Sequence, residues 1–189
     1  MFKLTKLIKS LKFSRNIRVY LLDNLAEMNN TINLAFLEIL VNKLKLRGIY
    51  ITLNKPYTAL IVDLKRRKID REKIFIIDCI TGKLSNALKK KKNCIFVQNP
   101  ESLFELSHIM SEIKKTGKYK FVFIDSAITL FLKAPEKEVI NFIKFHAYKT
   151  THHLDDYMIV SSIDHAKTKN LFRILSKEFR DVKLIESKK

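Results

Sequence analysis

Short apolar runs alternate along this chain with longer stretches in which apolar residues recur every three or four positions. Continuous runs bounded by polar residues are typical of buried strands, and the wider spacing is typical of helices that cover a core. We predict strands at 17–22, 49–53, 73–77, 94–97, 119–125, 157–161 and 182–185. Helices are predicted between them. This alternation indicates an α/β fold, with a mostly parallel sheet of about six to seven strands and helices on both faces.

Local signals mark several helix boundaries. Pro56 fits the first position of one helix, and the sequence Asn-Pro-Glu at 99–101 is a strong start for another. Asp164 is expected to cap a helix that continues to about Phe179, and a further helix begins at Pro135. Because glycine accepts the left-handed backbone that ends many helices, Gly48 and Gly117 are predicted stops.

The first sixteen residues form a separate pattern. Apolar residues fall on one side of a predicted helix over 1–16 and lysines fall mostly off it, so this segment is a basic amphipathic helix preceding one domain over 17–189. We expect the helix to pack on its own domain. The alternative is docking on a partner or on an anionic membrane surface.

Charge is the strongest compositional feature. The 189 residues include 37 Lys and Arg against 19 Asp and Glu, a formal net charge of +18. Such a charge favours a polyanionic partner, namely nucleic acid, an acidic protein or an anionic membrane. The alternative is lysine enrichment by an A/T-rich genome, and the scarcity of arginine argues against reading of DNA bases. The candidate polyanion-binding residues are Lys65, Arg66, Arg67, Lys68, Lys89, Lys90, Lys91 and Lys92.

No apolar run approaches the roughly 20 residues of a membrane-spanning helix. Cys79 and Cys94 are isolated thiols in apolar strands, which favours a reducing compartment. We therefore expect a cytoplasmic protein, with peripheral attachment to a membrane through residues 1–16 as the alternative.

Polar residues end several predicted strands, where open parallel sheets bind their ligands. Asp78 and Asp125 each end a strongly apolar strand, and two such carboxylates could hold Mg²⁺ with a nucleotide. The alternative, which we favour, is that they cap helices or accept hydrogen bonds from loop amides. The late histidines match no usual zinc spacing, so we expect structural roles for them and a core position for His146.

Three segments carry a resemblance to a known family. The sequence at 48–57, the sequence at 69–78 that ends in Asp78, and the strand 121–126 that ends in Asp125-Ser126 are similar to segments of the RecA/KaiC-like ATPase superfamily. In particular, the chain resembles short archaeal members that lack a functional phosphate loop. The resemblance implies a three-layer sandwich of the P-loop NTPase type, with Asp125 at the Walker B position and Ser126 beside it. It also implies self-association, because RecA-like domains commonly assemble side by side.

The departures from that family pattern bear on activity. The phosphate loop would fall at Leu22–Asn33, which contains no glycine for the backbone turn and no lysine for the phosphates. Asn54 and Lys55 replace the family's catalytic glutamate pair, and a protonated lysine cannot activate water as a carboxylate does.

Three functions remain open at this point. The leading prediction is a catalytically inactive binding or regulatory module that requires no cofactor, with residual binding of ATP and Mg²⁺ left open. The second is a nucleic-acid-associated protein that contacts phosphates without sequence preference. The third is an atypical Mg²⁺-dependent nucleotide hydrolase, whose turnover would depend on Asp125.

Overall fold

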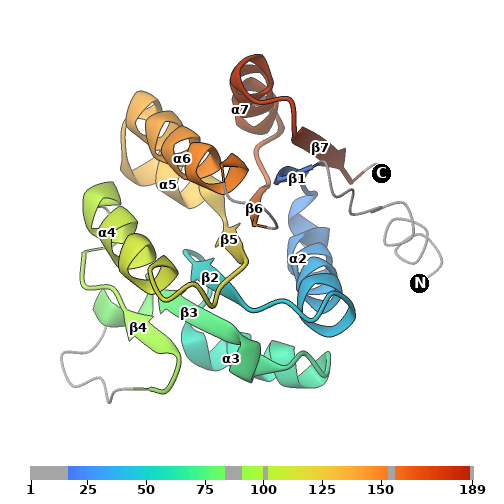
Figure 1. Ribbon diagram of the computed structural model, residues 1–189, viewed down its shortest axis with the longest axis vertical. Helices are drawn as coiled ribbons and strands as arrows, with labels where there is room; N and C mark the ends of the chain where they lie inside the picture. Colours follow the sequence, from blue (N-terminus) through green and yellow to red (C-terminus); the bar gives the residue numbers. More distant parts are fainter. Residues whose placement is uncertain (1–16, 84–90, 100–101, 153–155, 188–189) are drawn as a thin grey trace.

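The computed structural model describes residues 17–83, 91–99, 102–152 and 156–187. The predicted helix over 1–16, together with Lys89 and Lys90, lies outside these ranges. The described residues build three layers, a central sheet with helices on each face, as expected from the sequence (Figure 1). No helix in these ranges is both long enough and apolar enough to cross a lipid bilayer.

The sheet has seven strands in the described part of the chain, and every pairing between them is parallel. Their bounds are β1 Val19–Asp23, β2 Gly48–Thr52, β3 Ile74–Asp78, β4 Cys94–Phe96, β5 Phe121–Asp125, β6 Tyr157–Ser162 and β7 Val182–Glu186. Their spatial order is β4-β3-β2-β5-β6-β1-β7, so the first of the described strands lies between the last two.

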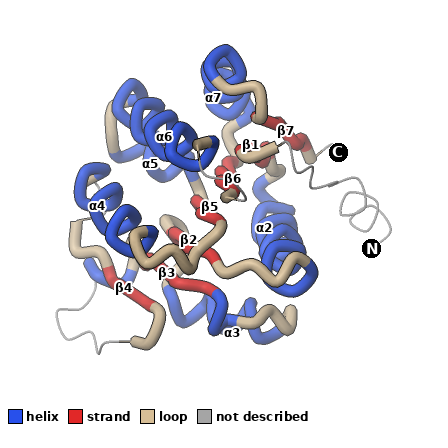
Figure 2. Tube along the Cα trace, in the orientation of Figure 1, coloured by secondary structure: helices blue, strands red, loops and turns tan. Residues whose placement is uncertain are grey.

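Two groups of helices cover the sheet (Figure 2). One face carries α2 (Asn29–Glu38), which continues as a π-helical turn over Ile39–Lys43, and α3 (Tyr57–Arg66). The other face carries α4 (Leu103–Lys114), α5 (Ala127–Lys133), α6 (Glu136–Thr151) and α7 (His165–Glu178). Single 3₁₀ turns occur at Ala26–Met28, Arg71–Lys73 and Thr81–Lys83.

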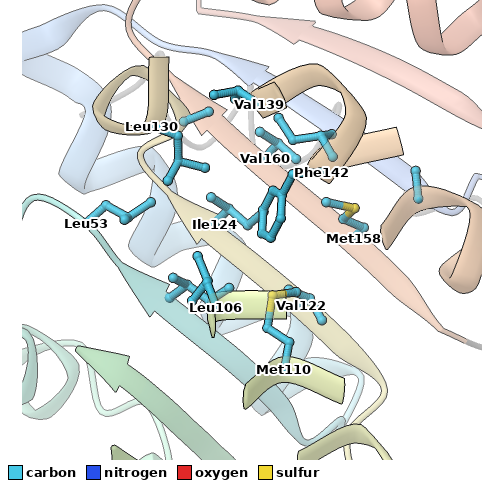
Figure 3. Close-up of a cluster of buried hydrophobic side chains, with 14 of the residues drawn as sticks. Leu53, Leu106, Met110, Val122, Ile124, Leu130, Val139, Phe142, Met158 and Val160 are labelled. Carbon is cyan, nitrogen blue, oxygen red and sulfur yellow. The ribbon is translucent and has the colours of Figure 1, made fainter. Parts of the chain in front are cut away.

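Alternate residues of each strand enter separate cores, because successive side chains of a strand point to opposite faces. On β5, Phe121 and Phe123 pack under α2 and α3, whereas Val122 and Ile124 pack under α4 to α7. Figure 3 shows Ile124 in contact range of the second group of helices, beside Phe142 of α6. Both faces of the sheet are therefore covered by apolar side chains, which explains why these strands read as continuous apolar runs.

The predicted strands agree with the observed ones to within about two residues, and three helix predictions were wrong in detail. The helix predicted from 99–101 begins at Leu103, where the Ser102 side chain accepts a hydrogen bond from the Glu105 amide. Pro56 and Pro135 occupy the capping positions, one residue before their helices. The helix α5 was not predicted at all.

Gly48 does not stop the preceding helix. That helix ends at Lys43, and the left-handed residue that follows is Lys45, with φ of 60°. Gly48 instead opens β2, where a Cβ atom would lie 2.2 Å from the ring of Phe121 on the neighbouring strand. Glycine is thus required here by close packing rather than by backbone conformation. Gly117, with φ of 68°, follows the end of α4 as predicted.

Candidate functional site

Asp125 is the centre of a polar cluster at the carboxyl end of β5. The residue is 3% exposed, and both of its carboxylate oxygens are engaged. The Tyr50 hydroxyl of β2 donates to Oδ2. The side-chain amides of Asn54 and Asn29 donate to Oδ1, at 3.2 Å and 3.5 Å. The protein itself therefore supplies the donors that a buried carboxylate needs.

Tyr50 stays protonated in this environment. Burial raises the pKa of its phenol well above the usual value, and the charge and hydrogen bond of Asp125 raise it further. The ring stacks on Phe123, with centroids 5.1 Å apart, which fixes the direction of the hydroxyl. Tyr50 is thus a permanent donor to Asp125.

Asparagine side chains fill the region where the resemblance places a phosphate loop. Asn24 follows β1 and is buried, and its amide nitrogen lies 2.9 Å from Asn29 Oδ1 and 3.1 Å from Asn33 Oδ1. Ser161, at the end of β6, donates to the same Asn29 oxygen at 2.9 Å. Asn29 in turn reaches Asp125. One connected network therefore ties the β1–α2 loop to the ends of β5 and β6.

Asn54 and Lys55, where the resemblance implies a catalytic glutamate pair, also make contacts within the protein. Asn54 binds Asp125, as described above. The Lys55 ammonium contacts Asp63 of α3 and the side-chain oxygen of Asn30, both at 2.5 Å. Partial burial opposes ionisation of Asp63, but the hydrogen bond and charge of Lys55 prevail and lower its pKa. Lys55 is thus directed toward Asp63 and not toward Asp125.

Asp78 belongs to a different set of contacts. It ends β3, is fully buried, and accepts hydrogen bonds from the amides of Tyr57, Ile80 and Thr81 at 2.7, 2.7 and 2.8 Å. The Thr81 hydroxyl supplies a fourth. Asp78 therefore caps the start of α3 and holds the loop after β3, in the manner of strand-end aspartates.

The structure does not bring Asp78 and Asp125 together. Both are register partners of Thr52 on the intervening strand β2, which separates them by two strand spacings, about 10 Å. Ser126 follows Asp125 and is buried, and its hydroxyl makes no hydrogen bond to any of the described residues.

The basic residues lie at the other edge of the sheet. Because α3 starts beside the carboxyl end of β2 and ends before β3 begins, Lys65, Arg66, Arg67 and Lys68 lie at the amino edge. Lys92 precedes β4 at that edge and pairs with Glu72 at 3.0 Å. Glu72 also contacts Arg71, and the guanidinium of Arg47 donates to its carbonyl oxygen at 3.0 Å. Among the described residues, the predicted basic positions are thus remote from Asp125.

His146 has the predicted core position. It is buried on α6, with its Nε2 atom 2.8 Å from the Ser107 hydroxyl of α4. Burial, and to a smaller extent Lys149 and Lys114, lowers its pKa to about 4. The imidazole is therefore neutral at pH 7 and joins the two helices.

Of the residues that surround Asp125, sequence reasoning singled out Asn54 and missed the others. Asn24, Asn29 and Asn33 entered only as part of the segment Leu22–Asn33 that lacks a phosphate loop, and Tyr50 entered only as part of a predicted strand. One signal was available: Asn29 and Asn33 lie one helical turn apart, a few residues after the strand predicted at 17–22.

The fold defines the class of structure as a three-layer α/β domain with a parallel seven-stranded sheet. The solved structure of a KaiC-like protein from the hyperthermophilic archaeon Pyrococcus horikoshii is similar, with a TM-score of 0.59 at 14% sequence identity. The similarity covers 89% of this chain and 71% of that one. No protein-family model and no curated protein matches the sequence.

Proposed function

We propose that this protein is a RecA/KaiC-like domain that does not hydrolyse nucleotides and acts as a binding or regulatory module. One observation carries the proposal: both oxygens of the Asp125 carboxylate accept hydrogen bonds from the protein itself, from Tyr50, Asn54 and Asn29. A Walker B aspartate has to turn toward Mg²⁺ and its water. Here that movement would break the network that holds the β1–α2 loop.

The residues around Asp125 support the same proposal. An activating carboxylate is replaced by Asn54, an amide that cannot take a proton from water. Lys55, the cation on this turn, is paired with Asp63. Within the part of the chain that the structure describes, the cluster therefore offers neither a general base in place of the glutamate nor a free positive charge for a γ-phosphate.

The test is release of phosphate from ATP and Mg²⁺, measured with the full chain and with the near-isosteric variant Asp125→Asn. We expect equal, background rates in both. Asp70→Asn, which changes an exposed aspartate at the other edge, is the matched control. Turnover that is lost in Asp125→Asn and kept in Asp70→Asn would overturn the proposal in favour of a nucleotide hydrolase.

The surface of α4, α5 and α6 is the proposed site of self-association. Large apolar side chains on this layer are exposed: Phe104 by 84%, Leu132 by 78%, Tyr148 by 54% and Phe145 by 48%. Exposed apolar side chains gathered on adjacent helices are typical of interaction surfaces. The three helices lie side by side over one face of the sheet (Figure 1).

Sedimentation velocity over a range of concentrations tests this surface. We expect a reversible dimer or larger assembly that the double variant Phe104→Ser, Tyr148→Ser converts to monomer. Val62→Ser, a change of equal character on α3 of the opposite face, should leave the assembly intact. A monomer at every concentration would reject self-association.

Such a module is expected inside the cell, because its two cysteines are free thiols.

Binding of nucleic acid is a second candidate, favoured by the gathering of basic residues at the amino edge. Arg71 and Lys92 contact the carboxylate of Glu72, and Arg47 donates to its carbonyl oxygen. The end of α3 adds Lys65 and its three basic neighbours. Phosphate contacts of this kind predict an affinity that does not depend on sequence and falls with salt. The slope of log affinity against log salt concentration should be roughly −0.9 for each phosphate that the protein neutralises. Fluorescence anisotropy with single- and double-stranded oligonucleotides measures that slope, and a salt-independent or absent signal would remove this candidate.

A further inference from the structure

A second polar cluster lies at the carboxyl edge of the sheet, on the face opposite Asp125. It consists of Asp23 at the end of β1, Glu186 at the end of β7 and His165, the first residue of α7. One ligand atom from each side chain lies within 4.8 Å of the others. Three different elements therefore converge on one point.

The strand register places the two carboxylates side by side. Asp23 and Glu186 are direct register partners on adjacent parallel strands, so their side chains leave the sheet on the same face. Two residues earlier, Leu21 and Leu184 are also partners, and both pack in the core beneath α7. The Asp23 carbonyl accepts a 2.9 Å hydrogen bond from the Ser187 amide, which holds the strand ends together.

The start of α7 holds His165 over these carboxylates. The Asp164 side chain accepts a hydrogen bond from the Lys167 amide at 3.0 Å, which fixes the first turn of the helix. His165 Nδ1 then faces Asp23 Oδ2. Asp23 is 6% exposed, whereas the His165 side chain is 59% exposed. The cluster is therefore buried at Asp23 and accessible to solvent at His165.

Two carboxylates at paired positions on neighbouring strands repel each other, and one of them is buried. This arrangement is costly unless a cation lies between them. Within the protein, Lys169 reaches only Glu186 Oε1, at 3.4 Å, and has an exposed side chain. The alternative to a bound ion is therefore two separate ion pairs, His165 with Asp23 and Lys169 with Glu186.

We propose that Asp23, His165 and Glu186 bind a divalent transition-metal ion of the zinc class. Two carboxylate oxygens and one imidazole nitrogen are ligands that Zn²⁺ accepts, and three protein ligands leave a coordination position for water. Mg²⁺ prefers oxygen ligands and binds such a set less well. This inference is independent of the proposed function, because the cluster shares no residue with the Asp125 network and lies on the other face of the sheet.

Titration of the full chain, without an affinity tag that contains histidine, with ZnCl₂ by isothermal calorimetry tests the proposal. We expect one Zn²⁺ per chain with a micromolar dissociation constant, and much weaker binding of MgCl₂. His165→Ala and Glu186→Gln should each weaken binding by at least about tenfold. Lys169→Ala should bind Zn²⁺ as tightly as the unchanged chain or more tightly, because its ammonium competes for Glu186.

The controls separate a metal site from ion pairing. His152→Ala removes an exposed histidine at the end of α6 and should leave the affinity unchanged. Equal affinities for the unchanged chain and for both His165→Ala and Glu186→Gln would overturn the proposal, as would the absence of stoichiometric Zn²⁺ binding. Loss of thermal stability in His165→Ala with no effect of Zn²⁺ on the unchanged chain would establish ion pairs only. The test uses variants of His165 and Glu186, because a substitution of the buried Asp23 could prevent folding.

Discussion

Replacing Asp78 by alanine removes the acceptor of four hydrogen bonds in a single change. Three donors are the amides of Tyr57, Ile80 and Thr81, and the fourth is the Thr81 hydroxyl. The Tyr57 amide is buried, so it finds no water after the substitution, while the other donors are partly buried and regain some. The start of α3 and the loop after β3 lose their common anchor.

The expected loss of stability follows from these contacts. A buried donor left without a partner costs about 1–3 kcal/mol, and a hydrogen bond to a charged group contributes about 1.5–3 kcal/mol before water replaces it. With one donor stranded and three partly compensated, Asp78→Ala should cost about 3–5 kcal/mol. For a chain of this length each kcal/mol shifts the melting midpoint by about 2–4 °C, so the midpoint should fall by roughly 6–20 °C.

Urea denaturation followed by circular dichroism measures this free energy for the unchanged chain, Asp78→Ala and Asp78→Asn. The asparagine keeps one acceptor oxygen and should lose about half as much stability as the alanine. A loss below about 1 kcal/mol in Asp78→Ala would refute the capping role. Nucleotide binding that needs Mg²⁺ and disappears in Asp78→Asn at unchanged stability would assign the carboxylate to a metal instead.

Three further predictions concern other buried positions. Gly48→Ala should cost about 1–3 kcal/mol in the same denaturation assay, because the added Cβ overlaps the Phe121 ring, and an unchanged stability would contradict this packing. The folded-state pKa of His146, about 4, lies below the usual 6.5, so the unfolded chain binds a proton first and stability falls as the pH drops from 6.5 to 4, by up to about 3 kcal/mol. His146→Gln should remove that slope, and a slope that persists would contradict its assignment to His146. Burial raises the thiol pKa of both Cys79 and Cys94 to about 12, so neither should react with a disulfide reagent at pH 8 until urea unfolds the chain, and rapid labelling of the native protein would contradict this burial.

The sheet was predictable because its five inner strands are buried on both faces and read as continuous apolar runs. The helix α5 was missed for a related reason. Five of its seven residues, Ala127–Lys133, are apolar, and seven residues are too few to show a helical period, so no helix was predicted there. Gly48 was misread because its role depends on Phe121, a partner 73 positions away in the numbering that only strand order reveals.

The candidate site was predictable only in part. The position of Asp125 at a strand end follows from the local pattern, and so does the capping role of Asp164. The hydrogen bonds that engage Asp125 come from Asn29, Tyr50 and Asn54, which belong to three elements. The order of the strands in the sheet decides which of these side chains lie next to Asp125. The sequence pattern does not reveal this, because a single polar residue has no periodicity that points to its partner.

The place of β1 within the sheet has a consequence for synthesis of the protein on the ribosome. β1 is made before the other strands that the structure describes, yet both of its neighbours, β6 and β7, begin only at Tyr157 and Val182. Until those residues emerge, the apolar run at 19–22 has no sheet to join and remains available to chaperones or to aggregation. Because β1 pairs with strands that are far away in the sequence, folding should also be slow for a domain of this size. A nascent chain arrested before residue 157 is therefore expected to remain sensitive to protease, and resistance should arise only after β7 has left the ribosome.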